Sequence, residues 1–113
     1  MNNNFTDKEL ETIAEGTFRY MLFVVNTNNP NVALEAFASV MFYMKNAFNC
    51  NDKQYLYCTK CYIRELEKAM KTTFEDSWIE NTLVPKLKNA NVDINLGSKI
   101  IDAVLEMYPS VFR

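Results

Sequence analysis

The chain has 113 residues, of which 49% are hydrophobic and 23% charged, so it is long enough to bury the core of one soluble domain. Its net charge of −2 lacks the broad positive surface that binding to phosphate backbones requires, which argues against a nucleic-acid partner. No apolar run reaches the roughly 18 to 20 residues of a membrane span, so we expect no membrane partner either.

The chain starts with MNNNFTDKELE, a polar and acidic segment that lacks the basic and then apolar order of a secretory signal. We therefore predict a cytoplasmic location, which would be the host cytoplasm if the protein is of viral or phage origin. Such an origin fits the fourteen asparagines, whose codons are AT-rich. We expect residues 1–5 to form a flexible tail on a single helical domain that spans residues 1–113.

The first predicted helix begins after Thr6, because Thr6 and Glu9 have the spacing of a capping box, in which each side chain binds the other residue's backbone N–H. Its apolar residues recur every three or four positions, and we expect this stripe to face the core: Leu10, Ile13, Ala14, Phe18, Met21, Leu22 and Val25. Tyr20 and Phe23 lie off the stripe. The polar segment NTNNPN ends the helix.

The second predicted helix spans about residues 30–48, with Asn29 as its N-cap and Pro30 at its first position. Only Glu35 and Lys45 are charged between residues 32 and 48, so this helix should be central and largely enclosed by the others. On a helical wheel, its large residues form one face, a ridge, and its small residues form another, the small-residue seam, whose last member is Ala47. Between these faces runs one narrow polar stripe of Glu35, Ser39 and Asn46.

Three more helices are predicted after residue 50. The third runs from a cap at Asn51 to about Lys71, and its inward residues are Tyr55, Cys58, Tyr62, Leu66 and Met70. The fourth opens near Thr73 and should kink or break near Leu83, because Pro85 removes a backbone hydrogen bond. The fifth spans about residues 96–108, and its inward residues are Ile100, Ile101, Val104, Met107 and Tyr108.

These segments predict an all-α fold, a compact single-domain bundle of about five helices packed around the apolar central helix at residues 30–48. No stretch alternates apolar and polar residues over a useful length, so no strand is expected.

The chain lacks the residues on which most catalytic sites depend. It contains no histidine, which excludes histidine-based nucleophile pairs and histidine-ligated metals, and its two glycines are too far apart for a phosphate-binding loop. Carboxylate pairs such as Glu11 with Glu15 lie among polar positions, where burial would not raise a pKa for acid–base work. We therefore predict that the protein is not an enzyme and has no cofactor.

Cys50, Cys58 and Cys61 form a C-x7-C-x2-C pattern that leaves alternatives open. A C-x2-C pair has the spacing of zinc knuckles and redox dithiols, which makes a small metal-binding or dithiol redox protein the alternative function. A zinc site would lack a fourth ligand, and Cys58 falls inside a helix and not at its N-terminus, where a reactive thiol is expected. Buried structural cysteines are therefore the favoured interpretation.

The aromatic residues indicate a binding protein. Five of them lie off the cleanest inward stripes and are the candidate partner-binding residues, namely Tyr20, Phe23, Phe42, Tyr43 and Tyr57. Exposed aromatic side chains are typical anchors of protein interfaces. We predict a regulatory or inhibitory factor that acts by protein–protein binding, with either another protein or a second copy of itself, as a homodimer, for its partner.

Overall fold

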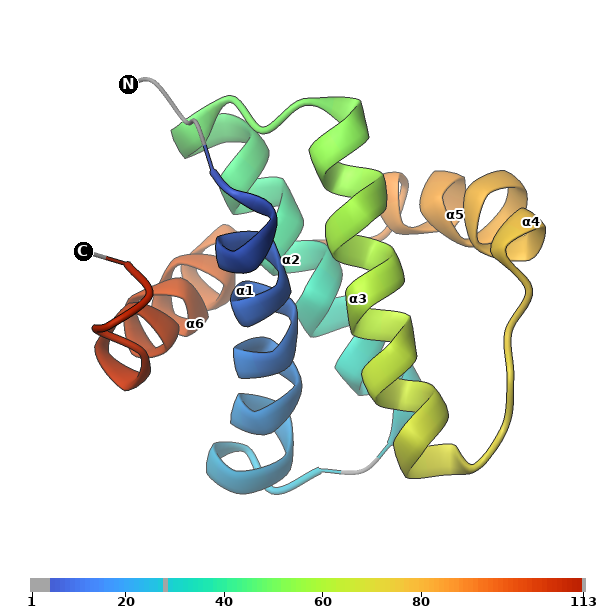
Figure 1. The fold of residues 1–113 in the computed structure, drawn as a ribbon, viewed down its shortest axis with the longest axis horizontal. Helices are drawn as coiled ribbons and strands as arrows, with labels where there is room; N and C mark the ends of the chain where they lie inside the picture. Colours follow the sequence, from blue (N-terminus) through green and yellow to red (C-terminus); the bar gives the residue numbers. More distant parts are fainter. Residues whose placement is uncertain (1–4, 28, 113) are drawn as a thin grey trace.

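The structure is a computed structural model, and it describes residues 5–27 and 29–112. In these ranges the chain forms five continuous helical segments and no strand, so the all-α prediction is confirmed. Helices α1 and α3 lie side by side in one layer, α2 crosses behind them, and α6 and the α4–α5 segment flank α2 on opposite sides (Figure 1). The radius of gyration is 12.9 Å, close to the about 13 Å expected of a compact chain of this length.

Helix α1 (Asp7–Arg19) begins with the predicted capping box, in which the Thr6 and Glu9 side chains bind each other's backbone N–H. It continues directly into a π-helical turn, η1 (Tyr20–Val24). There the Val25 N–H reaches back five residues to the Tyr20 carbonyl, at 3.1 Å. Asn26, at φ 63°, then ends the helix in the left-handed conformation that asparagine tolerates.

The wide turn η1 changes which side chains face the core. A π turn holds one residue more than an α turn, so every side chain after it is rotated relative to the α-helical pattern. Val25, predicted to face inward, is consequently exposed, because periodicity alone cannot show the extra residue. Tyr20, predicted to lie off the buried stripe, is buried although it opens the turn and keeps the α-helical register, with its N–H bonded to the Gly16 carbonyl. Both predictions are wrong.

Helix α2 (Pro30–Phe48) is the predicted central helix, capped by Asn29 with Pro30 in its first turn. Eight of its residues are buried, including Phe37, Val40, Met41 and Met44. The predicted polar stripe is only partly correct. Glu35 and Asn46 are exposed, but Ser39 is buried, where its hydroxyl donates to the Glu35 carbonyl and accepts the Asp93 N–H, both at 3.0 Å. Ala47, at the end of the small-residue seam, is exposed.

Helix α3 (Asp52–Met70) begins with a second capping box, between Asn51 and Gln54. Its Tyr62 lies at the centre of the core, stacked on Phe37 of α2 with ring centroids 4.2 Å apart and edge-on to Phe18 of α1 at 6.1 Å. The Tyr62 hydroxyl donates to the Ala33 carbonyl at 3.0 Å, so this buried polar atom is satisfied. One aromatic cluster thus joins three helices.

The next segment contains α4 (Asp76–Trp78), the π turn η2 (Ile79–Leu83) and α5 (Val84–Lys88). The predicted irregularity before Pro85 is confirmed, since a π turn ends at Leu83 and the proline, which cannot donate a backbone hydrogen bond, follows directly in α5. Ile79, Leu83 and Leu87 bury one face of this segment. The α-helical part begins after Glu75, which makes no side-chain cap.

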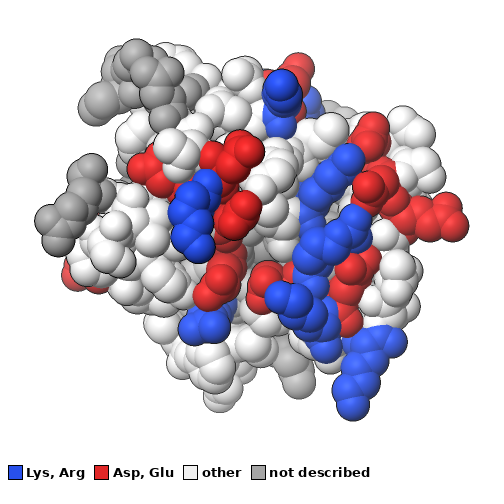
Figure 2. All heavy atoms as spheres, in the orientation of Figure 1, with Lys and Arg blue, Asp and Glu red and all other residues white. Residues whose placement is uncertain are grey.

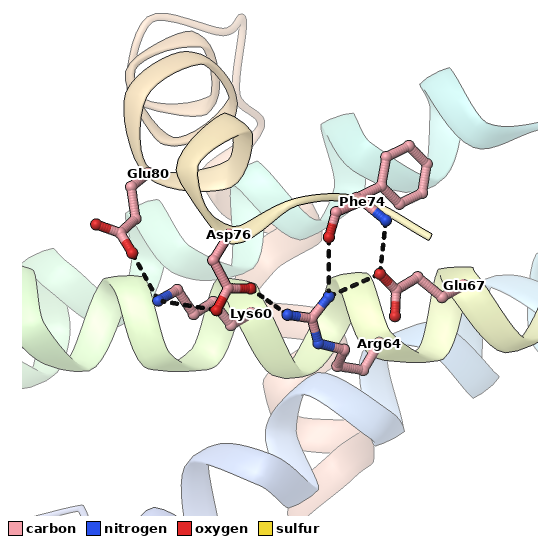
Figure 3. A network of polar contacts seen from close by, with 6 residues as sticks. All are labelled: Lys60, Arg64, Glu67, Phe74, Asp76 and Glu80. Atoms are coloured by element: carbon pink, nitrogen blue, oxygen red, sulfur yellow. Dashed lines mark hydrogen bonds and ion pairs between the residues drawn. The ribbon is translucent and has the colours of Figure 1, made fainter. Parts of the chain in front are cut away.

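A polar network fastens this segment to α3 (Figure 3). Arg64 pairs with Asp76 and with Glu67, at 2.7 Å from the latter, and also donates to the Phe74 carbonyl. Glu67 in turn accepts the Phe74 N–H at 2.7 Å, and Lys60 binds Glu80 at 2.8 Å. The connection after α3 is therefore held by charged hydrogen bonds on both sides of Phe74.

Helix α6 (Ile94–Met107) begins two residues earlier than predicted, because Asp93 caps it by accepting the N–H groups of Asn95 and Leu96. Both glycines of the chain lie at its contacts with other helices. A Cβ on Gly97 would lie 2.3 Å from the Ser39 carbonyl oxygen of α2, and a Cβ on Gly16 of α1 would lie 2.7 Å from Val104 of α6. Glycine is what allows α6 to pack this closely.

The ends of three elements differ from the expectations. Met70 and Met107, predicted to be inward, are each about half exposed because they occupy the last turns of α3 and α6, where the helices leave the core. Phe5, placed in the flexible tail, is half-buried with its ring 5.4 Å from that of Phe48, whereas the rest of the predicted tail, residues 1–4, lies outside the described residues. Among the described helices, none is long and apolar enough to cross a membrane.

Candidate functional site

The most exposed aromatic side chain of the described chain is Phe23, in the π turn that follows α1. Its exposed fraction is 78%, and the next two residues, Val24 and Val25, are exposed by 63% and 44%. Single apolar residues are common on protein surfaces, but a consecutive run is not. The run lies at the end of the molecule where η1, the start of α2 and the end of α3 meet (Figure 1).

A solvent-open cleft is lined in part by Met21 and Leu22, the two residues that directly precede this run. Helices α1 and η1 line it with Phe18, Met21 and Leu22, and the end of α3 lines it with Leu66, Ala69 and Met70. Thr27, Pro30 and Ala33 complete the lining, so none of the described residues around the cleft is charged. We call the cleft together with exposed Phe23, Val24 and Val25 the apolar end.

Charged side chains cover the face that α1 and α3 form. Side chains of both signs gather over these two helices, while the surface at the η1 end of α1 is mostly uncharged (Figure 2). The pairs include Arg19 with Glu15 at 3.3 Å and Lys68 with Glu65 at 3.2 Å. Such a mixed face is well hydrated, whereas the apolar end exposes side chains that water solvates poorly.

The five aromatic residues predicted to bind a partner do not form one surface. Tyr20 is only 6% exposed and is part of the core, although it adjoins the exposed run in sequence. Phe23 is the centre of the apolar end. Phe42, 41% exposed, lies elsewhere, on α2 beside a second groove.

Tyr43 and Tyr57 are half-buried and already have partners within the chain. The Tyr43 ring is 6.0 Å from that of Phe48, and its Cβ lies close to Gly97 of α6. The Tyr57 hydroxyl donates to a Glu11 carboxylate oxygen at 2.6 Å, which ties α3 to α1 and raises the pKa of the phenol. Both side chains thus have structural contacts that sequence reasoning did not anticipate.

The three cysteines are free thiols, and they do not form a metal-binding group. Among the described residues, no cluster of three histidine, cysteine, aspartate or glutamate side chains could hold a metal ion. Cys50 and Cys58 are buried, and the Cys58 thiol donates to the Leu10 carbonyl at 3.4 Å. Burial raises the pKa of all three thiols, to about 11 for Cys50. A raised pKa disfavours the thiolate, the form that binds metals and attacks disulfides.

The predicted carboxylate pairs lie on the surface in hydrogen bonds and ion pairs. Glu11 accepts the Tyr57 hydroxyl, Glu15 pairs with Arg19, and Glu80 pairs with Lys60. Carboxylates held by cations at an exposed surface lack the apolar surroundings that acid–base catalysis needs.

Sequence reasoning missed most of the apolar end. Val25 and Met70 were assigned to the core, and Val24 received no role. The signal that could have found them is the run Phe23, Val24 and Val25, where three consecutive large apolar residues cannot all face inward at the end of an α-helix. The cleft itself had no sequence signal, because the end of α3 joins the lining only after the chain has folded.

Comparisons of the chain with family models, curated proteins and solved structures found no match. We therefore infer the function from the residues and their geometry.

Proposed function

We propose that the protein is a non-enzymatic factor that acts by binding another protein through the apolar end. The observation that carries this proposal is the exposure of Phe23, at 78%, within an exposed apolar run that directly follows two residues of an uncharged cleft. Exposed aromatics next to hydrophobic pockets are the usual anchors of protein interfaces, where a few such side chains supply most of the affinity. A partner covering this end would remove that surface from water.

The chemistry of the cleft defines what the partner presents. Since no charged residue lines it, a charged group entering the cleft would lose its hydration without gaining a counter-ion. We therefore propose that the partner inserts an apolar side chain into the cleft while Phe23 packs against an apolar patch beside it. A protein that covers an apolar surface of its partner in this way can regulate or inhibit that partner, and we propose this role for the chain. We propose that the binding takes place in the cytoplasm.

The test compares Phe23→Ser with Leu105→Ser, using proteins captured from the producing cell and then purified. Leu105 is an exposed apolar residue of α6, so its replacement removes similar chemistry outside the apolar end. Phe23→Ser should weaken the affinity for the captured protein at least tenfold, as expected for an interface anchor, and Leu105→Ser should leave it unchanged. Both variants should keep the wild-type circular dichroism spectrum, because both side chains are exposed.

Light scattering across a range of protein concentrations separates the two partner classes. A mass that doubles with concentration in the wild type, but not in Phe23→Ser, would assign the apolar end to a second copy of the chain. A monomer at all concentrations supports a different protein as the partner. A captured protein that binds Phe23→Ser as tightly as the wild type would contradict the proposal.

A further inference from the structure

A second groove opens between α2, the start of α3 and the segment around α5, away from the apolar end. Its floor is apolar, formed by Ala38, Leu87 and Val92, and Phe42 stands at its edge with 41% of its surface exposed. The groove is open to solvent. It shares no lining residue with the cleft of the apolar end.

Two lysines give this groove its second property. Lys45 of α2 and Lys88 of α5 both line it, and no carboxylate is among its described lining residues. Lys88 is held in place, with its ammonium nitrogen 2.9 Å from an Asp52 carboxylate oxygen and 5.2 Å from the centre of the Tyr55 ring. Asp52 itself is exposed and is not among the residues that line the groove. Its single negative charge does not neutralise the two positive charges of Lys45 and Lys88.

Lys45 is the cation that a ligand could engage. Within the part of the chain that the structure describes, no carboxylate lies within ion-pair distance of its ammonium group, whereas Lys88 already has Asp52. Both lysines lower the pKa of Asp52. Lys88 does so by its hydrogen bond and its charge, and Lys45 by its charge, so both positive charges lie near this carboxylate. The groove is thus apolar at its floor and positive at its edge.

We propose that this groove binds an acidic segment of a partner protein, in which an aromatic or large aliphatic side chain is flanked by carboxylates. The apolar side chain would cover Ala38, Leu87 and Val92 and pack on Phe42, and a flanking carboxylate would pair with Lys45. Opposite charges at the edge of an interface determine which partner binds and in which orientation, while the buried side chain supplies the affinity. A phosphate backbone satisfies the lysines but leaves the apolar floor uncovered.

The probe is a synthetic hexapeptide in which phenylalanine and leucine are flanked by two glutamates on each side. It is titrated into the full-length, ¹⁵N-labelled protein at low salt, and the amide resonances are followed. We expect saturable shifts centred on Phe42, Lys45 and Lys88. Lys45→Glu should weaken binding about tenfold, because the new carboxylate repels the peptide where the lysine attracted it. The matched control Lys99→Glu changes an exposed lysine of α6 outside the groove and should bind like the wild type.

Each part of the proposal has a result that overturns it. A peptide with lysines in place of the glutamates, or one with serine and glycine in place of the apolar pair, should bind at least tenfold more weakly; equal binding contradicts the proposed chemistry. Shifts confined to other residues, or no shifts at millimolar peptide, contradict the site. Groove shifts produced by phosphatidylserine vesicles alone, or by raising the protein concentration alone, would assign the groove to a membrane surface or to a second copy.

The result is independent of the apolar end. Phe23→Ser should bind the acidic peptide as the wild type does, so failure at one surface leaves the other to be judged by its own variant.

Discussion

Gly97 marks the point where α6 crosses α2 with no room for a side chain. An added Cβ would lie 2.3 Å from the carbonyl oxygen and 2.8 Å from the carbonyl carbon of Ser39, and backbone atoms inside a helix cannot move aside as a side chain does. We expect Gly97→Ala to lower the free energy of unfolding by about 3 kcal/mol, despite the better helix propensity of alanine. Urea denaturation measures the loss.

The control for this prediction is Ser98→Ala, one position further along the same helix. It also gains helix propensity, though less than Gly97→Ala, and it does not meet the Ser39 backbone, so it should unfold within about 0.5 kcal/mol of the wild type. Equal stability of Gly97→Ala and Ser98→Ala would show that α6 does not pack on α2 as closely as described.

The buried thiol of Cys50 predicts a loss of stability at alkaline pH. Burial raises its pKa from the ordinary value of 9.0 to about 11, so between these values the folded protein holds a proton that the unfolded chain has released. The free energy of unfolding therefore falls as pH rises through this range, and the contribution is fully present below pH 9. Each pKa unit is worth about 1.4 kcal/mol, so the rise from 9.0 to about 11 makes the total loss about 3 kcal/mol.

Urea denaturation at pH 8, 9, 10 and 11 tests this dependence, with Cys50→Ala as the comparison. The variant lacks the Cys50 thiol, so its stability should fall less steeply between pH 9 and 11. Some decline remains in both proteins because burial also raises the pKa of Cys58, of Cys61 and of Tyr55, the last to about 12. Parallel curves for the two proteins would contradict the assignment to Cys50.

At the scale of elements, the connection between α3 and α4 depends on Arg64. This side chain contacts Glu67, Asp76 and the Phe74 carbonyl, and the Glu67 side chain that it binds is only 16% exposed (Figure 3). We expect Arg64→Ala to destabilise the protein by about 1 to 2 kcal/mol, since hydrogen bonds to charged groups exceed ordinary ones but solvent screens this half-exposed site. Urea denaturation provides the measurement.

Lys68→Ala is the matched control, because it removes a single i, i+3 ion pair from a lysine whose side chain is 74% exposed. Such a pair contributes little, so the change should be within about 0.5 kcal/mol. A similar effect of both substitutions would mean that the network around Phe74 adds nothing beyond ordinary surface charge pairs.

The starts of α1 and α3 were predictable from their capping residues. The residues Thr6 with Glu9 and Asn51 with Gln54 form the predicted capping boxes, since capping depends on neighbours three positions apart. The π turn η1 was not predictable, because it has no local residue signature and changes the register that periodicity assumes. Its consequence is the exposure of Val25.

The ion pairs and hydrogen bonds around Phe74 could not be predicted from the sequence either. The sequence places Glu67 and Lys71 at helical spacing, but the Glu67 carboxylate binds Arg64 and the Phe74 N–H instead. The competing partner is a backbone group that only the path of the following loop brings near. Local spacing therefore predicts which pairs can form, and tertiary structure decides which do.

At the scale of the whole molecule, the candidate site could be predicted only in part. Phe23 and Phe42 were identified from the helical pattern, and both are exposed, at 78% and 41%. The cleft and the groove beside them were not foreseen, because each is lined by segments from different helices. A sequence can indicate which side chains point outward, but the concave surface next to them exists only after folding.

The apolar end is the central claim, and site-specific photo-crosslinking tests it most directly. A photoreactive phenylalanine analogue is incorporated at position 23 and, in a second protein, at exposed position 105, and both are illuminated in the cell that produces the protein. We predict a discrete crosslinked product from position 23, with the partner's crosslinked residue being apolar, and none from position 105. Equal crosslinking from both positions, or none from position 23, would contradict a binding function at the apolar end.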